Sequence, residues 1–237
     1  MALIKSVILF LDAFHLWTAV TPPAGAARPQ ERVQSKGWER PIGQYLAYIG
    51  SYNKSLYAII CTLESIVLFA VHTDFLPRRI SSMLCLSDAE NCSNIRITPA
   101  FVLGSTLLIT GGQLRLACYR TMGRFFTFEL SMRSDHALCT SFPYSIIRHP
   151  SYTGLCACMV GEAILLCCNG SWLRECGWLG TRPVMAYFIT LVLLMIATII
   201  TTTKRTKVED KMLKERFGAE WETWAKRTPY SLIPYIY

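Results

Sequence analysis

Five apolar runs separated by polar segments dominate the pattern of hydrophobic positions along this chain. They cover residues 3–20, 55–73, 99–117, 152–168 and 183–203. A helix needs about 20 mostly apolar residues to cross the hydrocarbon core of a membrane. Each run meets or approaches that length, so the sequence predicts an all-α fold, a polytopic membrane helix bundle with about five spans.

The first run and the segment that follows it permit two interpretations. Asp12 and His15 interrupt the run, and the small residues at 24–27 make a cleaved signal peptide possible. We expect a retained first span. Residues 21–43 contain four prolines and mixed charges, which predicts a polar loop.

Two glutamates lie inside apolar runs, Glu64 in the second and Glu162 in the fourth. A charged side chain is costly in lipid, so we expect both to face the interior of the bundle, as functional groups or simply hydrogen-bonded to a neighbour. The fourth run is short and also contains Gly161. It is expected to tilt, to kink or to form a hairpin with the fifth.

The tail beyond residue 203 has a helical pattern of a different kind. Met212, Leu213, Phe217, Trp221 and Trp224 recur every three or four residues, and the remaining positions are rich in charge. This pattern predicts an amphipathic C-terminal helix lying against the membrane or the bundle. Gly218 is expected to break or bend the helix, and the prolines at 229 and 234 predict an extended end.

Composition and charge agree with a membrane protein. Of the 237 residues, 52% are hydrophobic and 17% charged, and the mean hydropathy is +0.31. The net charge is +8, but the chain has no basic cluster on a soluble fold of the kind that binds nucleic acid. A membrane surface with anionic lipid therefore explains the positive charge better than nucleic acid does. Sixteen lysines and arginines lie in 21–50, 120–150 and 204–237, against six on the alternate side. This imbalance predicts that those segments and the C-terminus are cytoplasmic; the sequons at Asn91 and Asn169 fall on the other side.

The ten cysteines show no spacing typical of a zinc site. Most lie in apolar runs, where cysteine behaves as a small hydrophobic residue. The sequence therefore predicts neither a metal site nor a disulfide framework.

Residues 145–154, Ser-Ile-Ile-Arg-His-Pro-Ser-Tyr-Thr-Gly, join a polar loop to the fourth apolar run. Pro150 fixes its own φ and pushes His149 toward an extended conformation. A helix is therefore expected to start after Pro150, with Ser151 and Tyr152 in its first turn, where N–H groups and the positive end of the helix dipole are free for a ligand. Arg205 and Glu209 stand four residues apart and share a helix face, either as a functional pair or as a surface ion pair.

Two motifs together resemble the isoprenylcysteine carboxyl methyltransferase family. The first is Arg148-His-Pro-Ser-Tyr-Thr-Gly154, and the second runs from Arg205-x3-Glu209 through Phe217-Gly and two tryptophans to Leu232-Ile-Pro234. Gly111-Gly-Gln-Leu-Arg115 and the segment from Ser134 to Thr140 add to the similarity. The resemblance covers about residues 100–237. It implies N-terminal spans and loops at 1–98 and a methyltransferase core at 99–237.

The resemblance implies methyl transfer from S-adenosylmethionine to the α-carboxylate of a prenylated C-terminal cysteine, in the endoplasmic reticulum membrane. It assigns Arg205 to substrate binding, and Arg205 and Glu209 to catalysis. The implied cofactor site consists of Glu129, His136, Ala137, Leu138, Cys139, Tyr144, His149, Pro150, Ser151, Tyr152 and Glu209. The chain departs from the family at Glu129, where glutamine is usual, and at Phe142-Pro143, where a glycine usually precedes the tyrosine.

A C-terminal carboxylate is ionised at neutral pH, so as an acceptor it needs alignment rather than a general base. Arg205 can hold it through two parallel hydrogen bonds, and Glu209 can bind the cofactor ammonium or orient Arg205. Two other enzyme classes share parts of these motifs or a related architecture, phospholipid N-methyltransferases and NADPH-dependent sterol reductases. An amine acceptor does not call for an arginine clamp, and a reductase needs more phosphate-binding basic residues than we can place.

Overall fold

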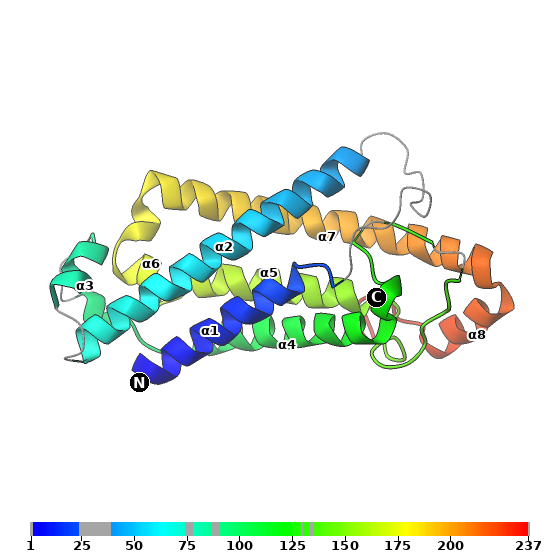
Figure 1. Cartoon of the computed structure of the whole chain (residues 1–237), viewed down its shortest axis with the longest axis horizontal. Coiled ribbons are helices and arrows are strands. Elements are labelled where there is room, and N and C mark those ends of the chain that lie inside the picture. Colours follow the sequence, from blue (N-terminus) through cyan, green and yellow to red (C-terminus); the bar gives the residue numbers. More distant parts are fainter. Residues whose placement is uncertain are drawn as a thin grey trace. The chain divides into compact units, whose positions relative to one another are not determined.

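A computed structural model of the chain describes residues 2–23, 39–73, 78–86, 91–128, 130–132 and 135–236. The regular elements within these ranges are all helices, and Figure 1 follows them along the chain. They are α1 (Ala2–Ala19), α2 (Glu39–His72), α3 (Arg78–Leu84), η1 (Asn91–Asn94), α4 (Pro99–Met122), η2 (Gly123–Phe125), α5 (Pro150–Cys167), α6 (Trp172–Glu175), η3 (Trp178–Gly180), α7 (Arg182–Phe217) and α8 (Ala219–Arg227).

The predicted membrane bundle is confirmed. Among the described residues, five helical segments are long and apolar enough to cross a membrane, and each overlaps one of the five apolar runs along almost its whole length. They are Ala2–Ala19, Ile49–His72, Pro99–Phe125, Pro150–Glu175 and Arg182–Phe217. The agreement is expected, because an apolar run of this length satisfies its backbone groups in lipid only as a helix.

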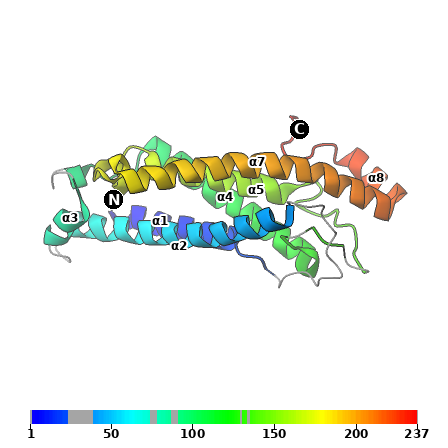
Figure 2. The same cartoon turned by 90° about the horizontal axis from the view of Figure 1, so that it is seen from above.

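Two observed helix boundaries differ from those that the hydrophobic pattern predicts. Helix α2 begins at Glu39, inside the segment predicted to be a loop, with Pro41 in its first turn, where the missing N–H costs no hydrogen bond. Helix α7 continues without a break from the fifth apolar run into the charged tail and ends at Phe217. The chain then turns at Gly218, whose φ of +52° favours glycine, before α8 begins (Figures 1 and 2). The predicted break at Gly218 is thus confirmed.

The chain forms two compact units, which are described separately. Unit 1 comprises Met1–Trp17, Asn53–Thr110 and Ala157–Ala197, and unit 2 comprises Thr18–Tyr52, Gly111–Cys156 and Thr198–Tyr237. Helices α1, α2, α4, α5 and α7 contribute residues to both units.

Two ionisable side chains in the interior of unit 1, Glu64 and Glu162, are paired with polar groups of other helices. Lys5 on α1 forms an ion pair of 2.5 Å with Glu64 on α2, and both are buried. Glu162, fully buried on α5, accepts hydrogen bonds of 2.8 and 3.0 Å from the amide of Asn53. The prediction that Glu64 and Glu162 face the protein interior is confirmed, and both take the hydrogen-bonded form of that prediction.

Small residues let α4 and α5 approach closely within unit 1. A Cβ added at Gly161 would lie 2.6 Å from the backbone oxygen of Gly104 and 2.8 Å from the backbone nitrogen of Leu108. The only side chain that fits is a hydrogen atom, as expected for close packing of membrane helices.

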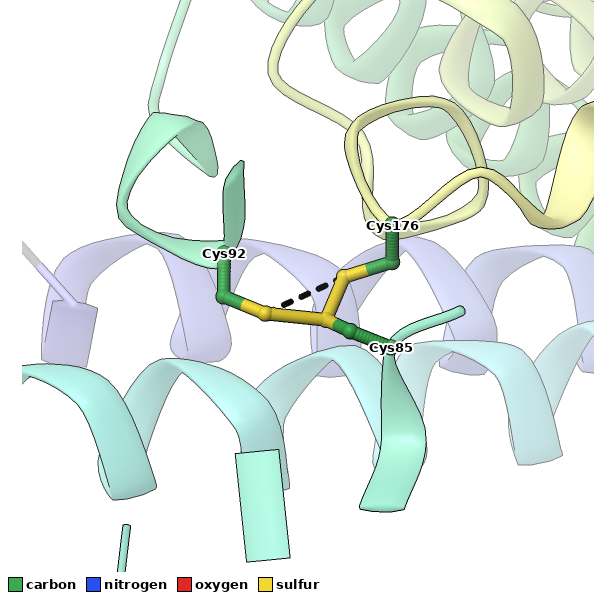
Figure 3. A group of neighbouring side chains, drawn as sticks. All are labelled: Cys85, Cys92 and Cys176. Carbon is green, nitrogen blue, oxygen red and sulfur yellow. Dashed lines mark hydrogen bonds between the residues drawn. A yellow bond between two sulfur atoms is a disulfide. The ribbon is translucent and has the colours of Figure 1, made fainter. Parts of the chain in front are cut away.

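The prediction that the cysteines form no disulfide framework is wrong in unit 1. The sulfur atoms of Cys85, Cys92 and Cys176 converge there, and Cys85 is within disulfide distance of both others (Figure 3). Sequence spacing did not reveal this group, because the first two cysteines and the third lie in separate connections between long helices.

Candidate functional site

The Arg148-His149-Pro150 segment lies in unit 2, where α5 begins at Pro150, one residue before the predicted start, with Ser151 and Tyr152 in its first turn as predicted. Two backbone N–H groups of the segment donate to the C-terminal tail, that of Arg148 to the oxygen of Tyr230 and that of His149 to the oxygen of Ser231, both at 2.9 Å. The hydroxyl of Thr153, in the first turn of α5, donates to the oxygen of Leu232 at 2.6 Å. The tail therefore fixes the start of α5 through a row of backbone acceptors.

Glu209 on α7 is the centre of the side-chain cluster. Its Oε1 accepts a hydrogen bond of 2.5 Å from the hydroxyl of Tyr152 and one of 2.8 Å from Nε of Arg205. Its Oε2 lies 3.3 Å from Nδ1 of His149. The His149 and Tyr152 rings stack at 5.9 Å between centroids. The structure thus brings together four residues that the sequence assigned to the site.

His149 is held between two carboxylates, because its Nε2 lies 3.0 Å from Oδ1 of Asp210. Burial of the ring disfavours the charged form, but the hydrogen bonds to Asp210 and Glu209 outweigh it and raise the pKa of His149 to about 9. The imidazole is therefore a cation at neutral pH that donates from both nitrogens. Asp210 also accepts from Nε of Arg148 at 3.1 Å, so it joins the two cations.

Ser151 is bound by Arg115 of α4. Nη1 of this buried arginine donates to the backbone oxygen of Ser151 at 2.9 Å and to its hydroxyl at 3.0 Å. Nε of Arg115 donates to the backbone oxygen of Ala19 at 2.6 Å. A Cβ added at Gly154 would lie 2.9 Å from Cγ of Arg115, so the glycine makes room for this contact. Arg115 therefore sets the position of the first turn of α5 against α4.

An aromatic cluster in unit 2 surrounds Tyr144, which is buried. Its hydroxyl donates to Sδ of Met122 at 2.8 Å, and its backbone oxygen accepts from Nε1 of Trp224 at 3.1 Å. Burial raises the pKa of Tyr144 far above its usual value, so the hydroxyl stays protonated. Leu138, Cys139 and Trp221 pack against the same cluster.

One polar atom of this cluster lacks a hydrogen-bond partner in the described part of the chain. Nε1 of Trp221 is buried there without an acceptor. An indole N–H is a donor only, and burying it unpaired is costly. The cluster therefore offers a donor to a ligand with an apolar or aromatic body.

The remaining predicted site residues are less closely connected to Glu209. The ring of His136 lies 4.9 Å from that of Phe125 and 6.3 Å from that of Phe217, between centroids. Ala137 is exposed, and Glu129 lies outside the described residues.

Asp210 and Arg115 are two residues of the site to which the sequence analysis gave no role. Asp210 follows Glu209 directly, and Arg115 ends the Gly111-Gly-Gln-Leu-Arg115 motif. The motifs therefore include both residues, but they do not indicate which side chains the two contact.

The comparisons with known proteins agree with the motifs. Residues 103–173 match the family model described as "Isoprenylcysteine carboxyl methyltransferase (ICMT) family". The chain is 30% identical over 135 residues to protein-S-isoprenylcysteine O-methyltransferase B of Arabidopsis thaliana, covering 56% of this chain and 58% of that protein. It is 23% identical over 206 residues to form A of the same plant, covering 83% and 94%.

A third relative is protein-S-isoprenylcysteine O-methyltransferase of Saccharomyces cerevisiae (strain ATCC 204508 / S288c), 29% identical over 137 residues, covering 57% of this chain and 49% of that protein. The matched part spans about three fifths of the first of these relatives. The resemblance to the family that the motifs predict is confirmed.

Proposed function

We propose that this chain, similar in its motifs and over much of its length to protein-S-isoprenylcysteine O-methyltransferases, methylates the α-carboxylate of a prenylated C-terminal cysteine with S-adenosylmethionine. Residues 99–237 carry the chemistry in this proposal. The observation on which it rests is the side-chain cluster around Glu209 in unit 2.

The charge of the cluster favours an anionic acceptor. Arg148, His149 and Arg205 are cationic, whereas Glu209 and Asp210 supply two negative charges, so the cluster carries one excess positive charge. A carboxylate is attracted to such a site. The amine of a phospholipid gains nothing from it, and this difference makes a phospholipid N-methyltransferase the weaker alternative. A sterol reductase would need a phosphate-binding basic cluster that these five residues do not form.

Arg205 has hydrogen-bond donors left for a substrate. A guanidinium has five N–H groups in a planar fork. Nε donates to Glu209, and Nη1 donates to the backbone oxygen of Phe128 at 2.7 Å. The other three N–H groups donate no hydrogen bond to a residue that the structure describes, and the side chain is 32% exposed. Glu209 and Phe128 hold the plane of the guanidinium, so the free donors point in a fixed direction.

The residues also suit the cofactor. S-adenosylmethionine has a flat aromatic base with hydrogen-bond acceptors, which matches the buried indole N–H of Trp221 and the aromatic cluster around Tyr144. Tyr144, Leu138, Cys139 and Trp221 would hold the adenosyl part, and Glu209 and Tyr152 would face its charged end. When bound, the cofactor supplies a methyl group on a positively charged sulfur.

The chain contributes alignment rather than proton transfer. A carboxylate acceptor carries no proton to remove, and His149 is already protonated, so neither His149 nor Glu209 acts as a base. Arg205 holds the acceptor oxygen, and Glu209 holds Arg205. Placing the reacting atoms about 3 Å apart in line is a large share of the rate enhancement for such a reaction.

We further propose an endoplasmic reticulum location with residues 204–237 on the cytoplasmic face, where prenylated proteins are accessible. The excess of lysine and arginine in that segment supports this orientation. Five membrane-spanning helices provide the apolar surroundings that a prenyl chain requires.

The test is methyl transfer in membranes that contain this chain, with S-adenosylmethionine labelled in its methyl group. N-acetyl-S-farnesyl-cysteine and phosphatidylethanolamine are supplied in separate reactions. We expect label on the prenyl-cysteine only, in a form that mild alkali releases as methanol, because an ester hydrolyses and an N-methyl group does not. Label on the lipid alone, stable to alkali, would show that the carboxylate proposal is wrong.

A further inference from the structure

Three buried cysteine sulfurs meet in unit 1, in a group that methyl transfer does not use. Cys85 follows α3, Cys92 lies in η1 and Cys176 follows α6. Their sulfur atoms all lie within 4.8 Å of one another, and those of Cys92 and Cys176 are 3.6 Å apart (Figure 3). Cys92 and Cys176 are fully buried and Cys85 is 7% exposed, so the group is sealed from solvent.

Hydrogen bonds on both sides of Cys85 hold it against the segment that carries Cys176. The indole N–H groups of Trp172 and Trp178 both donate to the backbone oxygen of Leu84, at 3.1 and 2.7 Å. The backbone N–H of Leu86 donates to the backbone oxygen of Cys176 at 3.0 Å. The residues before and after Cys85 are therefore both fixed to the 172–178 segment.

Cys85 lies within disulfide distance of both other cysteines, but a sulfur atom forms only one disulfide bond. The two pairings are therefore alternatives. The Cα atoms of Cys85 and Cys176 are 4.5 Å apart, and those of Cys85 and Cys92 are 7.0 Å apart. Disulfides usually have Cα atoms about 4.4–6.8 Å apart, so the first pair is within the range and the second lies beyond it.

We propose that Cys85 and Cys176 form the disulfide of this protein and that Cys92 remains a buried thiol beside it. The bond joins the connection between α2 and α4 to the connection between α5 and α7, across 91 residues of sequence. Cys92 fills space next to the bond as a small hydrophobic residue.

The bond forms by exchange with a disulfide-bearing oxidant, such as an oxidised thiol–disulfide oxidoreductase. One protein thiolate attacks the oxidant disulfide and releases one thiol. The second protein thiolate then attacks the mixed disulfide and releases the other thiol. Two protons and two electrons pass from Cys85 and Cys176 to the oxidant, which leaves as two thiols. Such oxidants act outside the cytosol, so the inference agrees with the proposed topology, in which these connections face away from the cytoplasm.

Peptide mapping tests the pairing. The full-length protein is taken from membranes, denatured in excess N-ethylmaleimide without reductant, and digested. Trypsin leaves Cys85 and Cys92 on one peptide, between Arg79 and Arg96, so a second cleavage after Glu90 is needed to separate them. We expect Cys85 linked to Cys176, and alkylation of Cys92 and the other seven cysteines. A link between Cys92 and either partner would overturn the assignment.

Serine variants of the three cysteines test which two of them form the disulfide. Cys92→Ser should keep the cross-link, while Cys85→Ser and Cys176→Ser should each lose it and lower the midpoint of thermal unfolding by roughly 10 °C. Cys167→Ser, a half-buried cysteine outside the group, is the matched control and should change neither. Should all three cysteines alkylate in the wild type, with one zinc or copper ion per chain before denaturation, the group is a thiolate metal site and the proposal is wrong. Full alkylation without metal overturns it equally. None of these readouts depends on methyl transfer, so this inference and the proposed function can fail separately.

Discussion

Nε of Arg205 donates a hydrogen bond of 2.8 Å to Oε1 of Glu209, one helical turn further along α7. An exposed pair with this spacing contributes little to stability. This pair differs, because the same carboxylate also accepts from Tyr152 and contacts His149. The sequence left open whether the pair was a surface ion pair or part of a site. Its surroundings favour a site, in which Glu209 orients Arg205.

The first prediction concerns the acceptor clamp. Arg205→Lys keeps the positive charge but loses the planar fork, so the acceptor oxygen is aligned less well. Removing a charge-assisted hydrogen bond costs roughly 1.5–3 kcal/mol, so kcat/KM for N-acetyl-S-farnesyl-cysteine should fall about ten- to hundredfold. Steady-state kinetics at saturating S-adenosylmethionine measure this fall.

A second pair of variants distinguishes a clamp from a general effect of charge. Arg205→Gln and Lys207→Gln each remove one positive charge from α7, and Lys207→Gln is the matched control because Lys207 is exposed. We expect Lys207→Gln to leave kcat/KM within a factor of two of the wild type. Equal losses in both variants would mean that Arg205 acts through general charge and does not clamp the substrate.

The second prediction compares two tryptophans of α8. Nε1 of Trp224 already donates to the oxygen of Tyr144, whereas the buried Nε1 of Trp221 has no acceptor among the described residues. Trp221→Phe should raise the KM for S-adenosylmethionine up to about tenfold and leave thermal stability nearly unchanged. Trp224→Phe should lower stability instead. Identical behaviour of the two variants would argue against a ligand at Trp221.

Much of the fold could be predicted from the sequence, because the thickness of the hydrocarbon core sets the length of an apolar run. The start of α2 could not, since Pro41 and the charges around it are as suitable for a first helical turn as for a loop. Nor could the continuity of α7 beyond residue 203. The charged residues that follow the apolar run are good helix formers, and no breaker occurs before Gly218.

The candidate site could be predicted in part. Spacing placed Arg205 and Glu209 on one face, but it could not show that Asp210, about 100° further round the helix, meets the other nitrogen of the same imidazole. Such a pairing depends on how α7 packs against the start of α5. The contact of Arg115 with Ser151, 36 positions away, depends in the same way on packing.

The third prediction concerns orientation. A protease-sensitive tag after residue 237 should be removed when sealed microsomes are treated with protease, because residues 204–237 are expected on the cytoplasmic face. A tag inserted between residues 86 and 91 should be protected. Protection of the C-terminal tag, with cleavage of the internal one, would invert the orientation and place the Glu209 cluster on the wrong side for cytosolic substrates.

The last prediction concerns His149 and pH. Burial of the ring lowers its pKa, but the hydrogen bonds to Asp210 and Glu209 outweigh burial and raise the pKa in the folded protein to about 9, above the usual 6.5. A raised histidine pKa contributes stability that is complete below pH 6.5 and is lost as the pH rises through 9. At about 1.4 kcal/mol per pKa unit, the contribution at low pH is about 3 kcal/mol.

His149→Gln keeps a hydrogen-bonding side chain but cannot become charged, so it removes this contribution. We expect the wild type to unfold at a higher temperature than the variant at pH 6, and the gap to narrow steadily between pH 6.5 and 9. Thermal unfolding of both proteins in the same detergent, at pH steps of half a unit, measures the gap. A gap that stays constant over this range means that the folded protein does not hold the extra proton. Asp210→Asn, which removes the negative charge of one of the two acceptors, should shift the closing of the gap to lower pH.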